Sequence, residues 1–189
     1  MDSQAVTTEP CVAGHTANDG GDCQKMSLTE LCDHIEATHH RYIRDEMPNL
    51  SNQVQEVAAI HAFKHLELLK VSRLFEGLRA DMETHLTREE GVLFPICRKL
   101  EVVDCRLTPF RGSVANPIQH MEKVHEKAGL AVHTIRILTA NYQPPNGNDS
   151  YRAMLESLRK FDDDLQEHLR KEKDILFPGA LAREKQLGL

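Results

Sequence analysis

"HLTREEGVLFP" runs from His85 to Pro95, and "HLRKEKDILFP" runs from His168 to Pro178. The two stretches are identical at six of eleven positions, which include the His, the Glu four residues later and the closing Leu-Phe-Pro. A match of this length, about half the chain apart, indicates that the protein consists of two related halves.

Both stretches lie in long helical patterns, in which apolar residues recur at spacings of three and four. The first pattern begins at the capping box Ser27–Glu30, and the second covers about residues 69–102. The third starts from an Asn116-Pro117 cap, and the fourth covers about residues 149–184. Because no stretch alternates with period two, we predict an all-α protein: an antiparallel up-down-up-down four-helix bundle made of two duplicated helical hairpins.

The composition is that of an ordinary globular domain of 189 residues, with 40% hydrophobic and 28% charged residues. The net charge of -6 is spread over interleaved charges without a basic block, which argues against nucleic acid as a partner. No apolar run approaches the roughly 20 residues of a membrane span, so we expect no membrane association.

The N-terminal segment, residues 1–26, is rich in Gly, Asp, Thr and Ala, and we expect it to be a flexible tail before a bundle over residues 27–184. It lacks the basic start and apolar core of a signal peptide, so we expect a cytoplasmic location. The five Cys are odd in number and form no CxxC pair, which favours free thiols.

Each repeated stretch places a His and a Glu on one helix face, as His85/Glu89 and His168/Glu172. Such pairs often occur by chance on a solvated surface. Here the pair occurs twice, lies on the apolar stripe and precedes Leu-Phe-Pro, where polar groups without partners would be costly. An imidazole and a carboxylate in this arrangement can bind one metal ion, so we predict a metal site.

Each half also has a His on its other helix: His39 or His40 in the first half, and His120 or His125 in the second. The apolar stripe slightly favours His39 over His40. Either way, two hairpins would supply four imidazoles and two carboxylates, enough for two metal ions bridged by the carboxylates. Without thiolates this set suits iron, manganese or zinc, and it leaves open positions for a small ligand such as O₂ or NO.

Six segments of the chain resemble the hemerythrin-like (HHE) cation-binding domain, and within it the repair-of-iron-centres di-iron proteins. They are "HHRYIRDEMPNL" (His39–Leu50), "VAAIHAFKHLEL" (Val57–Leu68), "HLTREEGVLFP", "PIQHMEKVHEKAG" (Pro117–Gly129), "YQPPNGNDSYRAM" (Tyr142–Met154) and "DLQEHLRKEKDILFP" (Asp164–Pro178). The resemblance selects the second His of the His39-His40 pair and selects His125 over His120. It therefore implies six metal ligands: His40, His85, Glu89, His125, His168 and Glu172.

The resemblance also implies two non-haem iron ions bridged by an oxo group and by carboxylates. The implied function is repair of iron–sulfur clusters damaged by nitrosative or oxidative stress, by iron donation or NO handling, with damaged iron–sulfur proteins as clients. A reversible carrier or sensor of O₂ or NO is the alternative. A metal-binding repair protein is favoured over a conventional enzyme, although NO reductase or peroxidase activity stays open. We expect a monomer or a homodimer.

The chain departs from that family in three places. We expect no N-terminal tandem-Cys domain, since the only Cys of the N-terminal segment, Cys11 and Cys23, lie far apart. Val124 replaces an acidic residue before the third-helix His, and Lys173-Asp174 replaces Asn-Asn after the last Glu. None of these positions is one of the six implied ligands.

His61 and His65 are expected to have structural roles, and His120 and His133 are expected to lie on the surface or just outside the metal site. His61 and His65 lie one helical turn apart, but His61 is about 30 Å along a continuous helix from His40. It therefore cannot bind the same ions. His34 points elsewhere on the helix and could supply an outer hydrogen bond.

Overall fold

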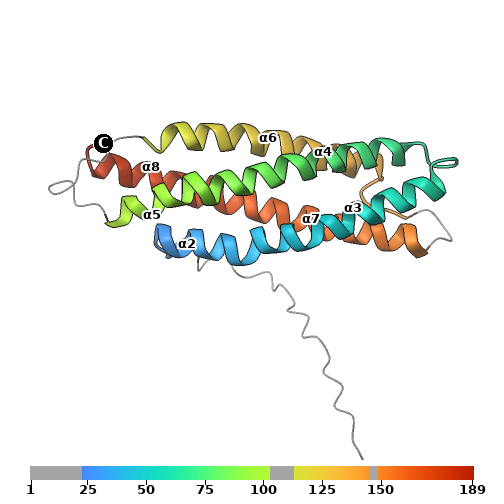
Figure 1. Cartoon of the computed structure of the whole chain (residues 1–189), viewed down its shortest axis with the longest axis horizontal. Helices are drawn as coiled ribbons and strands as arrows, with labels where there is room; N and C mark the ends of the chain where they lie inside the picture. The colour runs from blue at the N-terminus through green and yellow to red at the C-terminus, as the bar shows by residue number, and fades with distance from the viewer. Residues whose placement is uncertain (1–22, 103–112, 145–148) are drawn as a thin grey trace, which may run out of the picture.

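The computed structural model describes residues 23–102, 113–144 and 149–189, and all regular structure in these ranges is helical. Four long helical rods lie side by side along the longest axis of the molecule (Figure 1). In chain order their segments are α2 (Leu28–Ile35), η1 (Glu36–His40), α3 (Arg41–His61), α4 (Glu67–Arg88), η2 (Glu89–Leu93), α5 (Phe94–Val102), α6 (Ala115–Leu138), α7 (Asp149–Lys171), η3 (Glu172–Leu176) and α8 (Phe177–Gln186). The predicted all-helical fold is confirmed.

Three of the four rods contain a five-residue π-helical segment, and in each case it adjoins or contains a predicted ligand. η1 ends at His40, η2 begins at Glu89, and η3 begins at Glu172. A π turn closes its hydrogen bonds from i to i+5, which rotates the following side chains relative to an α-helix, and such turns are frequent at functional sites. The repeated stretches therefore differ from ordinary helix in their backbone as well as their residues.

The start of the first rod agrees with its sequence signal. The Ser27 side chain accepts a hydrogen bond from the Glu30 backbone N–H, and the Glu30 carboxylate accepts one from the Ser27 backbone N–H. Pro48 lies inside α3, and the helix continues through it.

The start of the third rod differs from its prediction. Helix α6 begins at Ala115, so the expected cap at Asn116-Pro117 is wrong. The Val114 backbone N–H instead donates to the Glu184 carboxylate of α8 over 2.6 Å. A carboxylate from a distant part of the chain thus replaces the local cap, and Pro117 falls in the first turn, where backbone N–H groups have no intrahelical acceptor.

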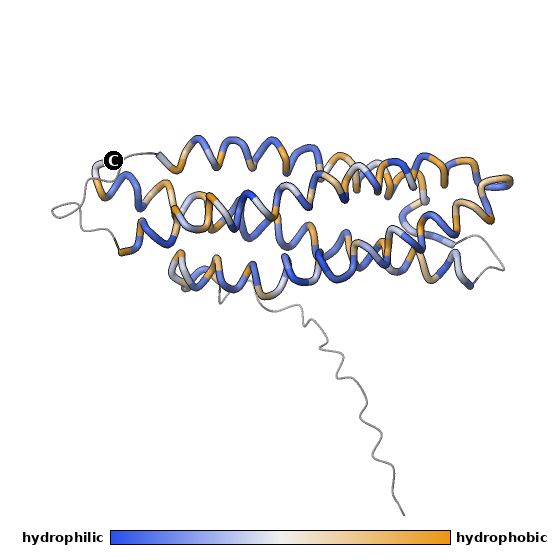
Figure 2. The backbone as a smooth tube through the Cα atoms, in the orientation of Figure 1, coloured by the Kyte–Doolittle hydropathy of each residue, from blue (hydrophilic) through white to orange (hydrophobic). Residues whose placement is uncertain are grey.

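The interior contains two apolar clusters. The longer cluster includes Ile43, Leu86, Ala128 and Leu165. The shorter cluster includes Ile35, Leu93, Met121 and Leu176. Hydrophobic and hydrophilic residues alternate along every rod, as expected for helices with one buried face (Figure 2). On every rod the predicted ligands fall between a residue of one cluster and a residue of the other, so a polar layer separates the two apolar regions.

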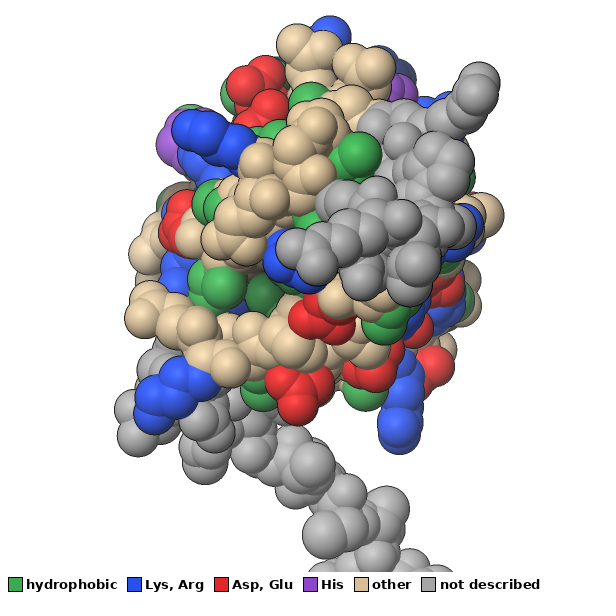
Figure 3. All heavy atoms as spheres, turned by 90° about the vertical axis from the view of Figure 1, so that its left-hand side faces the viewer, with side chains coloured by type: hydrophobic (Ala, Val, Ile, Leu, Met, Phe, Trp, Pro, Cys, Tyr) green, Lys and Arg blue, Asp and Glu red, His purple; other side chains and the backbone are tan. Residues whose placement is uncertain are grey.

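Most of the predicted N-terminal tail, residues 1–22, lies outside the described residues. Cys23 is described and is buried in the shorter cluster together with Cys32 and Cys97, and none of the three forms a disulfide within the described residues. At the end of the molecule that carries α5 and α8, side chains of both charges are interspersed with hydrophobic ones (Figure 3). In the described ranges, no helix combines the length and apolar character needed to cross a membrane.

Candidate metal centre

The six predicted ligands meet in the polar layer between the two apolar clusters. They come from all four rods: His40 from η1, His85 from α4, Glu89 from η2, His125 from α6, His168 from α7 and Glu172 from η3. Five of them are at most 1% exposed, and His125 is 9% exposed. Residues more than 130 positions apart in the chain therefore converge on one enclosed site.

The ligand atoms form two groups whose members lie within 4.8 Å of one another. The first group contains His40, His168, Glu89 and Glu172, and the second contains His85, His125 and the same two carboxylates. Each group takes one imidazole and one carboxylate from each half of the chain. One copy of the repeat could therefore supply only half of either pocket.

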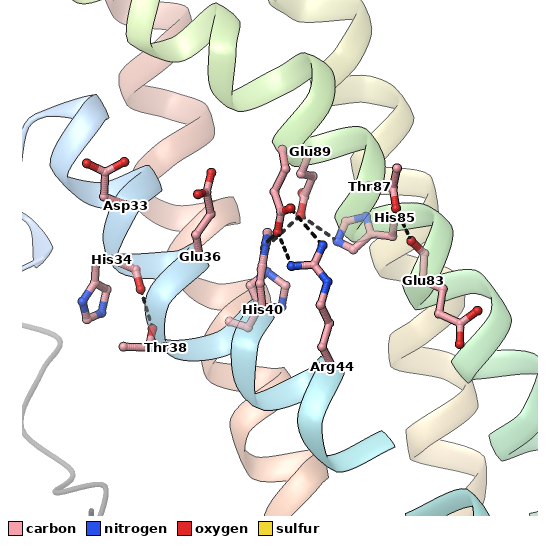
Figure 4. Close-up of polar contacts among 12 residues, drawn as sticks. Asp33, His34, Glu36, Thr38, His40, Arg44, Glu83, His85, Thr87 and Glu89 are labelled. Atoms are coloured by element: carbon pink, nitrogen blue, oxygen red, sulfur yellow. Dashed lines mark hydrogen bonds and ion pairs between the residues drawn. The ribbon is translucent and has the colours of Figure 1, made fainter. Parts of the chain in front are cut away.

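The spacing within the groups is that of atoms bound to a shared ion. The four shortest contacts are His40 Nε2 to Glu89 Oε2 at 3.3 Å, His85 Nε2 to Glu89 Oε2 at 3.2 Å, His125 Nε2 to Glu172 Oε2 at 3.1 Å, and His168 Nε2 to Glu172 Oε1 at 3.1 Å. Two ligand atoms each about 2.1 Å from one ion, at a right angle, would lie about 3 Å apart. Figure 4 shows His40 and His85 converging on Glu89 from neighbouring rods.

None of these four contacts is a hydrogen bond. The Nε2 atoms of all four imidazoles and both oxygens of both carboxylates are buried without a hydrogen-bond partner. Each such group costs about 1–3 kcal/mol when it is left unpaired. A pair of divalent cations would satisfy all eight atoms, so the donor set fits the metal site expected from the sequence.

The electrostatics of the site fit the same conclusion. Burial, with help from His168, lowers the pKa of His40 to about 4, and burial lowers the pKa of His85 to about 3. Both imidazoles are therefore neutral at neutral pH, which is the form that binds metals. Burial and the adjacent Glu172 carboxylate raise the pKa of Glu89 well above its usual range. Two neighbouring buried carboxylates ionise together only when cations lie between them.

Each repeated Leu-Phe-Pro places an aromatic ring against a ligand imidazole. Phe94 stacks on His40 with ring centroids 5.3 Å apart and planes at 16°. Phe177 stacks on His125 at 5.5 Å and 17°. The ring of each half thus fixes the imidazole on the other helix of that half. The identical Phe in the two stretches was a signal of this role, which the sequence analysis missed.

His40 has a second partner that the sequence analysis also missed. Its Nδ1–H donates to Glu90 Oε1 over 2.8 Å, and the Glu90 carboxylate accepts two hydrogen bonds from Arg44, over 2.7 and 2.9 Å. We call Glu90 and Arg44 the brace. A carboxylate on one ring nitrogen fixes the tautomer and directs the other, Nε2, toward a metal. The adjacent glutamates in "REEG" were the available signal.

Comparison with known proteins now identifies the family. Residues 33–180 match the family model of the hemerythrin HHE cation-binding domain. The chain belongs to this family. It is 32% identical, over 85% of its length and 69% of the relative's, to a protein from Edwardsiella ictaluri named iron–sulfur cluster repair protein YtfE. Proteins with the same name from Salmonella paratyphi B and Salmonella newport are 30% identical over 86% of this chain and 70% of their own. Family membership and the buried His/Glu cluster together suggest iron binding.

In this hemerythrin-family chain, His39 is buried beside the ligands. Its Nδ1 lies 2.9 Å from Asp164 Oδ1, and its ring stacks on His168 at 5.6 Å and 11°. His40 rather than His39 meets the carboxylates, which agrees with the choice that the family resemblance implied. Val124, which takes the place of His39 in the second half, cannot form such a polar contact.

The other histidines that the structure describes lie outside the two groups. His34 Nε2 is 2.8 Å from the buried Lys171 Nζ, and His120 contacts Arg88. His61 and His65 lie against the ring of Tyr151, with centroids 6.0 and 5.4 Å apart.

Proposed function

We propose that the chain holds two iron ions, one in each group, with Glu89 and Glu172 bridging them. The observation that carries this proposal is that both carboxylates belong to both groups, while each imidazole belongs to one. Bound iron would offer open coordination positions to a small ligand such as NO or O₂, and a store of metal that can be given up. The protein's own residues would exclude water, keep the imidazoles neutral and hold them in place.

We further propose that this protein supports the repair of iron–sulfur clusters damaged by nitrosative or oxidative stress, with damaged iron–sulfur proteins as clients. The names of its relatives from Edwardsiella and Salmonella support this assignment. The donor set supports it as well. Imidazoles and carboxylates bind ferrous iron without the thiolates that hold zinc or copper more firmly, so iron can leave the site.

The arrangement of the rods supports the predicted bundle topology. Along the first and third rods, the shorter apolar cluster comes before the ligand and the longer cluster after it, as at Ile35 and Ile43 around His40. Along the second and fourth rods the order is reversed, as at Leu86 and Leu93 around Glu89. We therefore infer that the rods alternate in direction, as an up-down-up-down bundle of two hairpins requires.

The test is a reconstitution of a cluster enzyme inactivated by NO. Protein loaded with ferrous iron is incubated anaerobically with that enzyme, and recovered activity is compared with recovery in the same concentration of free ferrous iron. We expect faster recovery with the loaded protein. The variant Glu172→Ala should give no more than free iron, whereas Glu156→Ala, at an exposed position of α7, should behave as the original protein.

Recovery equal to that with free iron would contradict the repair proposal. In that case a stable, reversible spectrum with NO or O₂ would support the second candidate, a carrier or sensor. The open positions left by four protein ligands at each ion are the reason to keep that candidate.

A further inference from the structure

The two groups have the same donor atoms, but their surroundings are unequal. In the first half the brace fixes His40 through Glu90 and Arg44. The repeat aligns His40 with His125, and Glu89 with Glu172. The same alignment places Gly129 at the position of Arg44 and Lys173 at the position of Glu90. Glycine has no side chain and a lysine ammonium cannot accept an N–H, so the second half cannot form a brace of this kind.

The two groups also differ in exposure. Nδ1 of His85 in the second group and Nδ1 of His168 in the first are both buried without a hydrogen-bond partner among the described residues, so this feature is common to the two groups. His125 is the most exposed of the six ligands, at 9%. Among the described residues, no carboxylate binds Nδ1 of His85 or His125, whereas Glu90 binds Nδ1 of His40. Partners of this kind typically change metal affinity by roughly 10–100-fold.

We infer that Glu90 is a positioning residue for His40, and that the two metal positions are therefore functionally different. The first group retains its ion, and the second group releases its ion first. This inference rests on the proposed function and makes it more specific, since the iron supplied to a client would come from His85 and His125. Glu90 acts through His40 and has no contact with the ion.

The surface next to the brace could suggest the opposite. Glu90 and Arg44 line a hollow of about 380 Å³ together with Asp33, Glu36 and Ala37. Three carboxylates there could attract a departing cation. However, Arg98 binds both Asp33 and Glu36, at 2.7 and 2.9 Å, and Arg44 binds Glu90. Because arginines already neutralise these carboxylates, we assign the hollow no role in release.

The experiment measures how fast a ferrous chelator removes iron from the anaerobic protein loaded with two ions per chain. We expect a fast and a slow phase of equal size. Glu90→Ala should accelerate the slow phase about 10-fold or more and leave the fast phase unchanged. Glu90→Gln, which keeps an acceptor oxygen, should have a smaller effect. The matched control is Glu83→Ala, since Glu83 is an exposed glutamate of α4 paired with Arg79.

The reciprocal variant transfers the brace to the second half. A Cβ at Gly129 would meet no atom within 4 Å, so Gly129→Arg combined with Lys173→Glu is sterically accessible. This double variant should slow the fast phase and leave the slow phase unchanged. Because it adds contacts, its effect cannot be explained by loss of folding.

A single release phase from the original protein would overturn the inference, as would an effect of Glu90→Ala confined to the fast phase. The same holds if Glu90→Ala and Glu83→Ala give equal rates. Failure of the proposed function gives different results. If the chain bound no ferrous pair, the two-ion loading itself would fail, and if it did not repair clusters, the two release phases would still be present.

Discussion

The two halves of the chain are built alike around the ligand atoms and differently just outside them. In both halves a Phe from the repeated stretch stacks on a ligand His, Phe94 on His40 and Phe177 on His125. In both halves, a basic residue three positions after the His of the repeated stretch contacts a histidine of the other half. The pairs are Arg88 with His120 and Lys171 with His34. Duplication has preserved the features that hold the rings and the ligand helices in place.

The differences concern groups that adjust a ligand rather than supply one. Asp164 lies four residues before His168 and contacts the buried His39, whereas Asp81, four residues before His85, pairs with the exposed Lys127. The first group is thus surrounded by more polar contacts than the second. A symmetric ligand set within asymmetric surroundings can hold two similar ions with different strength.

The shared carboxylates give the largest expected effect. Glu172→Ala or Glu89→Ala should lose both ions, because each carboxylate belongs to both groups. His85→Ala should lose mainly the ion of the second group. The measurement is iron per chain after desalting the anaerobically loaded proteins. Retention of both ions by either glutamate variant would show that the carboxylates do not bridge, and the two groups would then have to be treated as independent sites.

The stacked rings should give the next largest effect. Phe94 and Phe177 are 0% and 2% exposed, so Phe94→Ala and Phe177→Ala should each lower the free energy of unfolding by about 3–5 kcal/mol. Chemical denaturation of the metal-free proteins measures this. Because the two stacks have nearly the same geometry, we expect similar losses. A loss at one position only would mean that the halves differ in packing as well as in polar contacts.

The repeated stretches made the helical fold predictable, together with four of the six residues that meet in the buried cluster, because a buried polar residue needs its type at a fixed position on a helix. The choice of His40 and His125 came from the family resemblance. The brace was not predictable in the same way. Glu90 and Arg44 are 46 residues apart, and nothing in the sequence pairs them. The cap that Glu184 provides for α6 crosses 70 residues and was equally hidden. Contacts of this kind depend on how the rods pack against one another. Sequence periodicity describes each rod separately and contains no information on that packing.

The choice between His39 and His40 illustrates a second limit. Periodicity assumes an unbroken α-helix, and on that assumption the apolar stripe slightly favours His39. Both residues lie in the π segment η1, where hydrogen bonding from i to i+5 changes the direction of the side chains. As a result, His40 faces Glu89 and His39 faces Asp164. The π turn itself has no sequence signal that we can identify.

A smaller effect on stability is expected at Asp164 and Asp81, the aspartates four residues before His168 and His85. His39→Val should destabilise the protein by about 1–3 kcal/mol, because the largely buried Asp164 loses its partner. Lys127→Ala, which removes the partner of Asp81, should change the unfolding free energy by less than about 1 kcal/mol, since Lys127 is exposed and Asp81 is partly exposed. Thermal denaturation compares them. Equal losses would mean that the two pairs have the same energetic role despite their different burial.

The last prediction concerns the pH dependence of the metal-free protein. The pKa values of His40 and His85 lie below the ordinary 6.5, so both imidazoles take up protons on unfolding between about pH 4.5 and 6.5. Glu89, whose pKa is raised, releases a proton on unfolding and offsets part of this uptake. Because two imidazoles take up protons, stability falls as the pH drops below 6.5.

Above pH 6.5 the stability of the metal-free protein changes with pH in the opposite direction. Burial lowers the pKa of His125, but its contacts with Glu172 and Glu89 outweigh burial and raise it to about 9. His125 therefore releases a proton on unfolding, and stability falls as the pH rises toward 9. Thermal midpoints between pH 5 and 9 should show a maximum near 6.5. His125→Gln should weaken the alkaline decline and leave the acid decline in place, because the protonated imidazole belongs to the second group only. A midpoint that rises continuously to pH 9 would contradict the proton-holding role assigned to His125.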